Sequence, residues 1–188
     1  STATLGNSGA ISGTVYIRLA ASTGYGDYSG DILLSSTNAT TVNVAIGNSS
    51  VGKRSLTITA NSVNKVYGQT LMGGSGSVAF TSSGLQNGEI IGNVSVAYGT
   101  GAAANAAVNT YTATVTPSAA TGGTFASSNY NITYAKGDII VGAKSLTITA
   151  SNVNKTYGQL LTGTAGSTAF TSSGLENGAF TSVDLVNA

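Results

Sequence analysis

The chain has 188 residues, only 7% of them charged, and a net charge of +1. Typical soluble domains are about 25% charged, so this composition excludes electrostatic capture of nucleic acid and a polybasic membrane-binding patch. Cysteine and histidine are both absent. Their absence excludes disulfides, thiolate metal sites and the usual neutral-pH general base.

Alternating apolar residues predict short strands along most of the chain. Val, Ile, Leu and Tyr recur at every second position, which is typical of half-buried strands. The segments are 14–20, 40–46, 55–60, 93–99, 110–117 and 130–134. We expect these side chains to face inward: Val15, Ile17, Leu19; Val42, Val44, Ile46; Leu56, Ile58; Val94, Val96, Tyr98; Tyr111, Ala113, Val115; Tyr130, Ile132 and Tyr134.

Turn signals separate the predicted strands. Asn87-Gly88 favours a tight hairpin because both residues tolerate positive φ. The alanine-rich segment 99–110 is flanked by Gly and Asn, and we expect a loop or an edge there. No helical stripe extends beyond two turns. The predicted fold class is therefore all-β, a β-sandwich with a thin core.

An internal repeat dominates the organisation of the chain. Residues 55–88 and 145–178 are identical at 25 of 34 positions without a gap, at an offset of 90 residues. Solenoid repeats are about 20–50 residues long, so this period predicts duplication of a whole small domain. We expect a complete repeat at 53–142, the first half of a second copy at 143–188, and the closing part of a different module at 1–52.

Several separated motifs resemble a known family. "KSLTITASNVNKTYGQ" and "FTSSGLENG" are followed, in the complete copy, by "YTATVTPSAATGGTFASSNYNITYAKGDIIV". This order is similar to the MBG repeats, which are glycine-rich, mostly-β domains of very large bacterial surface adhesins. The N-terminal "GTVYIRLAASTGYGDYSGDILLSSTNATTVNVAIG" resembles the end of an Ig-like module common in secreted proteins of Bacteroidota.

The resemblance implies an elongated array of tandem Ig-like/MBG β-sandwich domains at the surface of a Gram-negative cell. It also implies export by the type 9 secretion system and a gliding-motility adhesin as the parent protein. The family supplies no catalytic residue and no cofactor, so we expect no enzyme. The expected partners are neighbouring repeats and outer-membrane secretion or motility machinery. Membrane insertion is not expected, because no apolar run approaches about 18 residues.

Acidic residues give two weak functional hypotheses. Asp27 and Asp31 are the only close pair, and their spacing is too long to chelate calcium unaided. Glu89 and Glu176 belong to different repeats, too far apart for the paired carboxylates of a glycosidase. We therefore expect these acids, with Asp138 and Asp184, to lie in solvated turns, and we assign no catalytic, metal or cofactor residue.

Two lysines at equivalent positions of the repeat have two possible roles. Lys65 and Lys155 each precede a tyrosine by two residues, Tyr67 and Tyr157. They could form a carbohydrate contact repeated along the array. The favoured interpretation is structural: the tyrosines cover the sandwich edge, and the lysines cap carbonyls or protect an edge strand.

Other charges cluster at the predicted domain junctions, where interdomain pairs would set the angle between modules. They are Lys53, Arg54, Lys136, Asp138 and Lys144.

The sequence is consistent with three candidate functions. The favoured one is a non-enzymatic stalk segment that extends a distal binding tip. The first alternative is a subunit of an extracellular filament, completed by strand donation between chains. The second is a carbohydrate-binding region of a secreted enzyme, which would need an exposed aromatic platform although the chain has no Trp. The ligand-binding residues are unknown.

Overall fold

The computed structural model describes residues 16–163 and 169–176. The chain divides into two compact units, residues 1–52 and 53–188. Among these residues, strands make up nearly all of the regular structure, and one short 3₁₀ turn, Ser127–Asn129, precedes β9 (Tyr130–Ala135). The predicted all-β class is confirmed. In the described ranges, no helix has the length and apolar character needed to cross a bilayer.

The first unit contains an antiparallel pair of strands, β1 (Gly26–Leu34) and β2 (Val42–Val51). The strand predicted at 40–46 is confirmed as part of β2. The prediction that Val42 and Val44 face inward is wrong, however, because their side chains are 53% and 42% exposed. Among the described residues of this unit, no second sheet covers their face.

The strand predicted at 14–20 is also wrong. Residues 14 and 15, with Val15, lie outside the described residues, and 16–20 form no strand. Tyr16 is 90% exposed. A strand requires a neighbour for its backbone N–H and C=O groups, and no described strand pairs with this segment. Alternation of apolar residues does not indicate whether a partner strand is present.

The complete repeat is built from two sheets. A three-stranded sheet has the order β6-β3-β9, and a five-stranded sheet has the order β4-β10-β8-β7-β5. The strands are β3 (Arg54–Ala60), β4 (Val63–Val66), β5 (Gly74–Ser77), β6 (Phe80–Ser83), β7 (Ile91–Tyr98), β8 (Asn109–Gly123), β9 (Tyr130–Ala135) and β10 (Gly137–Gly142).

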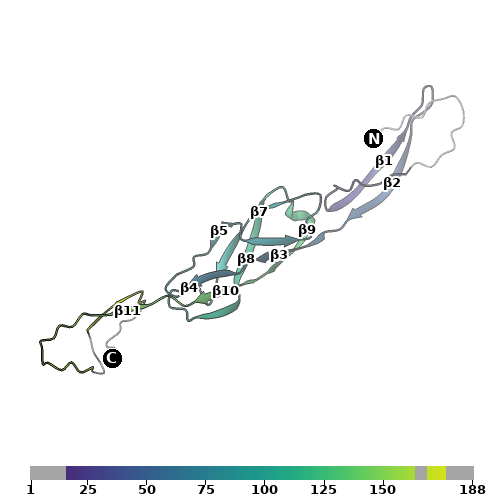
Figure 1. The fold of residues 1–188 in the computed structure, drawn as a ribbon. Coiled ribbons are helices and arrows are strands. Elements are labelled where there is room, and N and C mark those ends of the chain that lie inside the picture. Colours follow the sequence, from purple (N-terminus) through teal and green to yellow (C-terminus); the bar gives the residue numbers. More distant parts are fainter. Residues whose placement is uncertain (1–15, 164–168, 177–188) are drawn as a thin grey trace. The chain divides into compact units, whose positions relative to one another are not determined.

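Two parallel ribbons run the length of this repeat. β3 continues into β4, and β9 continues into β10, each passing from the smaller sheet to the larger one (Figure 1). β3 pairs parallel with β9, and β4 pairs parallel with β10. The ribbons approach closely at the crossover, where a Cβ on Gly137 would lie 2.6 Å from the Ala60 carbonyl oxygen. Only glycine fits this position without displacement.

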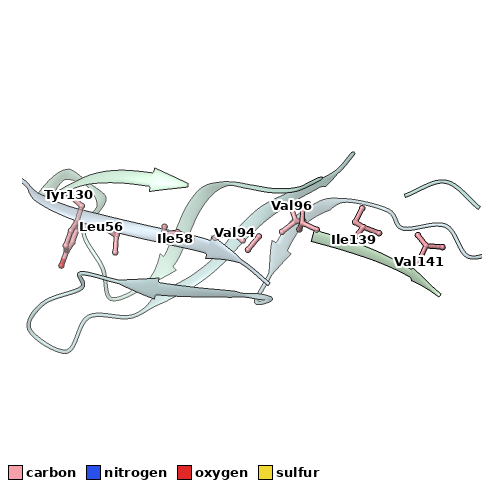
Figure 2. Packing of buried hydrophobic residues seen from close by; sticks show 9 residues of the cluster. Leu56, Ile58, Val94, Val96, Tyr130, Ile139 and Val141 are labelled. Carbon is pink, nitrogen blue, oxygen red and sulfur yellow. The ribbon is translucent and has the colours of Figure 1, made fainter. Parts of the chain in front are cut away.

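The hydrophobic core is a narrow row of side chains between the sheets. Figure 2 shows the labelled residues strung along the repeat from Tyr130 to Val141. Leu56, Ile58 and Val94 are fully buried, as predicted from the alternation. The other buried members are Ala60, Val96, Val115, Tyr130, Ile139 and Val141. Partly buried residues such as Phe80, Tyr98 and Ile132 pack against this row. Burying one large aliphatic side chain contributes about 1.5–3 kcal/mol, so each fully buried member contributes measurably to stability.

The predicted alternation fails within β8. Ala113 is exposed and has a φ of +54°, instead of facing inward between Tyr111 and Val115. The ladder to β10 slips there, because Val115 is opposite Gly137 while Tyr111 is opposite Ile139. The extra residues form a bulge, which moves the Ala113 side chain out of the core.

The Asn87-Gly88 turn forms as predicted, but it does not close a hairpin. Asn87 and Gly88 have φ values of +53° and +71°, and the Glu89 N–H donates to the Gln86 carbonyl at 2.9 Å. The flanking strands β6 and β7 belong to different sheets. The turn therefore carries the chain from one layer of the sandwich to the other. The loop expected after residue 98 is confirmed, and β8 begins at Asn109.

The second copy contains two described strands, β11 (Thr147–Ala150) and β12 (Phe170–Ser173). They pair antiparallel in the register of β3 and β6, shifted by the repeat period. Thus Ile148 is opposite Ser172, as Ile58 is opposite Ser82.

Candidate functional site

A tight turn, Tyr67-Gly68-Gln69, follows β4 at the end of the repeat where the chain leaves. Gly68 has a φ of +94°, which favours glycine. The Gln69 N–H donates to the Val66 carbonyl at 3.1 Å, and the Val66 N–H donates to Gln69 Oε1 at 2.9 Å. The glutamine therefore closes the turn with both its backbone and its side chain.

Backbone hydrogen bonds connect this turn to two other segments. The Tyr67 N–H donates to the Gly142 carbonyl at the end of β10, at 2.9 Å. The Gly68 N–H donates to the Ala104 carbonyl at 2.9 Å, and the Leu71 N–H donates to the Ala102 carbonyl at 3.0 Å. The turn thus joins the last strand to the loop before β8.

Lys65 lies beneath this turn and is only 4% exposed. Its Nζ donates to the Gln69 carbonyl at 2.8 Å and to the Ala103 carbonyl. Charge-assisted bonds of this kind are stronger than neutral ones. The interpretation of Lys65 as a carbonyl cap is confirmed, and this buried lysine belongs to β4, an edge strand of the five-stranded sheet.

A second buried polar residue, Tyr130, lies at the opposite end of the repeat, where β9 begins beside β3. Its hydroxyl donates to Glu89 Oε2 at 2.5 Å and accepts from the Gln86 N–H at 3.1 Å. Burial and the bond to Glu89 raise the pKa of Tyr130 above its ordinary value. Glu89 therefore binds a partner instead of lying in a solvated turn. That partner is 41 residues away, and no sequence motif indicated it.

Asp31 and Glu176 also have structural contacts, and the expectation that Asp27 and Asp31 lie in turns is wrong, because both are on β1. Asp31 Oδ2 accepts from Asn43 Nδ2 at 2.6 Å across the β1–β2 pair, and Asp27 lies on the same strand. Glu176 pairs with Lys144. Asp184 lies outside the described residues. Within 16–163 and 169–176, no three His, Cys, Asp or Glu residues gather as metal ligands.

Most of the junction charges also bind within their own repeat. Arg54 Nε donates to the Gly84 carbonyl at 3.2 Å, and Lys144 pairs with Glu176. Asp138 Oδ1 accepts from the Ala113 N–H at 2.8 Å, and so stabilises the bulge in β8. For these three residues the predicted interdomain pairs are wrong, because closer partners inside the repeat satisfy them.

Two open hollows border the complete repeat. One, of about 390 Å³, lies beside the turn, and the other, of about 350 Å³, lies beside β5. The first is lined by Asn64, Lys65, Val66, Gln69, Ile140 and Gly142. The second is lined by 72–77, Val96 and Tyr98. Neither lining combines an acid, a base and a nucleophile, so their chemistry supports no catalytic assignment.

Comparison with known families adds an independent finding. Residues 56–139 match the model of the MBG domain, YGX type. The match covers most of the complete repeat and includes the Tyr67-Gly68-Gln69 turn. MBG domains are structural repeat domains associated with extracellular surface proteins. The comparison with curated proteins gave no match, and neither did the comparison with solved structures.

Proposed function

Since the complete repeat is an MBG domain of the YGX type, we propose that this chain is a non-enzymatic stalk segment of a cell-surface adhesin. The segment lengthens the stalk and holds a distal binding tip away from the cell. Its partners are the neighbouring repeats of the same protein.

The direction of the chain through the repeat carries this proposal. The first pair of the parallel ribbons is Arg54 with Tyr130, and the last is Val66 with Gly142. The chain therefore enters beside the start of β3 and leaves beside the end of β10, at the opposite end. Copies of such a domain add length when they are joined in series.

The side-chain chemistry supports the same function. The two buried polar residues, Lys65 and Tyr130, bind carbonyls, a backbone N–H and a carboxylate of their own repeat. These bonds hold the two ends of the domain in place, which is a structural role for both residues.

A spacer exchange in the native protein tests the stalk. Residues 55–144, one full period, are replaced by an unrelated rigid β-sandwich of equal length, and in a second strain they are deleted. We expect exchanged cells to attach to surfaces as the parent does, and immunogold labelling of intact cells to place the segment outside the envelope. Loss of attachment in the exchanged strain, with normal export, would show that the repeat itself binds.

We extend the proposal to the parent protein, a gliding adhesin of a Bacteroidota cell exported by the type 9 system. The support is the resemblance of the N-terminal 35-residue stretch and of the MBG motifs. In such a cell, removing the outer-membrane translocon should abolish surface labelling while the protein accumulates inside. Unchanged labelling would refute this route.

A filament is the second candidate, and one observation favours it. β11 pairs with β12 on one side, and no described strand occupies the other side, where β3 has β9. Leu146 and Ile148 are 42% and 43% exposed, whereas Leu56 and Ile58 are fully buried. A strand donated by another chain would cover them.

The mass of the purified chain distinguishes the two candidates. A stalk segment stays monomeric in light scattering as its concentration rises, whereas a donated strand produces assemblies that grow with concentration. A peptide with the sequence of residues 129–142 should block that growth by occupying the position of β9. Ile148→Asp, at the exposed edge, should block it as well.

A further inference from the structure

The two parallel ribbons of the complete repeat have a second consequence. We propose that they form a mechanical clamp, which resists unfolding when the two ends of the domain are pulled apart. This inference rests on the proposed function only in that a stalk experiences tension. The clamp itself is a property of this fold.

The register of the ribbons defines the clamp. Six residue pairs join β3 to β9, from Arg54–Tyr130 to Thr59–Ala135. Four further pairs join β4 to β10, from Ile139–Val63 to Gly142–Val66. One ribbon is continuous with the incoming chain and the other with the outgoing chain, and the two run in the same direction along the whole repeat (Figure 1).

Tension along the chain therefore acts on these ladders in shear. Pulling at residue 53 draws β3 backward along its own axis, while pulling at residue 143 draws β10 forward. The backbone hydrogen bonds between parallel strands lie across that direction, so all of them share the force. If the strands were pulled apart from one end, the bonds would break one after another at a lower force.

Contacts at both ends hold the ribbons in register. At the outgoing end, the Tyr67 N–H donates to the Gly142 carbonyl, and Lys65 anchors the same turn through two carbonyls. At the incoming end, Tyr130 binds Glu89 and the Gln86 N–H. The interior residues Leu56, Ile58 and Ile139 pack between these ends and would have to slide past one another.

Pulling the same protein in two directions tests the clamp. The chain contains no cysteine, so two introduced cysteines define where force is applied to the full chain in an optical trap. Gly52→Cys with Ala143→Cys applies shear. Ser55→Cys with Asn131→Cys peels the ribbons, because these two exposed residues are directly paired.

We expect the shear pair to unfold at about threefold higher force than the peeling pair at one loading rate, since forced unfolding reports the barrier in the pulled direction. Both variants should keep the parent melting temperature. Thr57→Cys with Thr133→Cys, another exposed pair in register, replaces the peeling variant if that one fails to fold. Equal forces in the two directions would overturn the clamp.

The two proposals fail separately. Equal forces would leave the stalk intact if the spacer exchange preserves attachment. Loss of attachment in the exchanged strain would remove the stalk function without altering the ratio of forces.

Discussion

The two copies of the repeat, the complete one and the half repeat, are identical at 25 of 34 positions, and their described residues share one strand pair and one turn, although residues 153–156 form no strand where the first copy has β4. β11 and β12 pair in the register of β3 and β6. The Thr156 N–H donates to Gln159 Oε1 at 3.1 Å, as Val66 does to Gln69. Strand pairing and turn geometry are therefore determined within these 34 residues.

Burial differs sharply between the two copies. Ile58 is fully buried and Ile148 is 43% exposed, while Tyr157 is fully exposed and Tyr67 is half-buried. Lys65 is buried beneath its turn, whereas Lys155 is exposed. The difference comes from β7 to β10, which cover the first copy. Local sequence thus determines the pairing of these strands, and the later strands determine how far their side chains are buried.

The largest expected effect is at the core position. Ile58→Ala should lower the free energy of unfolding by about 3 kcal/mol, because it leaves a cavity in a fully buried site. The matched variant Ile148→Ala should change it by less than about 0.5 kcal/mol. Urea denaturation followed by circular dichroism measures both values. Equal losses would mean that the second copy has a core of its own.

The second-largest effect on stability is expected at Lys65, for which Lys155 is the equivalent residue in the second copy. Lys65→Met should cost about 2 kcal/mol, because it removes the ammonium group that donates to the Gln69 and Ala103 carbonyls. Lys155→Met, at the exposed equivalent position, serves as the control and should be almost neutral. The same denaturation measurement applies. A neutral Lys65→Met would show that water reaches these carbonyls.

Tyr130→Phe should cost about 1 kcal/mol at neutral pH, since it removes the bonds to Glu89 and to the Gln86 N–H. Thermal melts of the variant and the parent at pH 7 measure this loss. No described residue of the half repeat corresponds to Tyr130, so the variant tests only the closed copy.

The same tyrosine predicts a loss of stability in alkali. Its pKa is raised in the folded state, so folding favours the protonated phenol. The resulting stabilisation is complete below the ordinary tyrosine pKa of about 10 and disappears as the pH rises through the folded value. Glu89 and Arg54 are the charged groups that act on it. Melts between pH 8 and 11 should therefore fall more steeply for the parent than for Tyr130→Phe, and parallel slopes would contradict this cause.

The smallest effect is expected at the ion pair of the half repeat. Glu176→Gln removes the partially exposed pair with Lys144, and such pairs contribute only about 0–1 kcal/mol. Amide exchange in β11 should rise slightly, and exchange in β3 should not change. A large increase would mean that this pair contributes far more to the stability of β11 than an exposed ion pair should.

The sequence predicted β3, β7, β8 and β9, whose apolar residues alternate and meet another layer. It missed β10, where Ile139 and Val141 are buried, because the apolar residues there follow one another without alternation. Leu56, Ile58 and Val94 have the burial that their alternation indicates. The prediction failed at 16–20 and for the inward face of β2, because alternation does not reveal whether a covering layer exists. It failed at Ala113 because a bulge depends on a distant acid, Asp138.

Only the Lys65 part of the candidate site could be predicted from the sequence. The "NKVYG" motif indicated that Lys65 caps carbonyls, since lysine and tyrosine recur at one spacing in both copies. The motif could not identify Ala103, which is supplied by a loop 38 residues away. The Tyr130–Glu89 pair gave no signal, because the two residues are 41 positions apart and no short motif contains both.

Because the amine of Lys65 is buried, its chemical modification would report how often the repeat opens. An acylating reagent applied to living cells would modify an accessible Lys155 at once, and would reach Lys65 only after the turn above it opens. The ratio of the two modified peptides in mass spectrometry would then measure how often a repeat opens within its native array. The same ratio, followed while cells hold on to a surface in flow, would reveal whether tension exposes the interior.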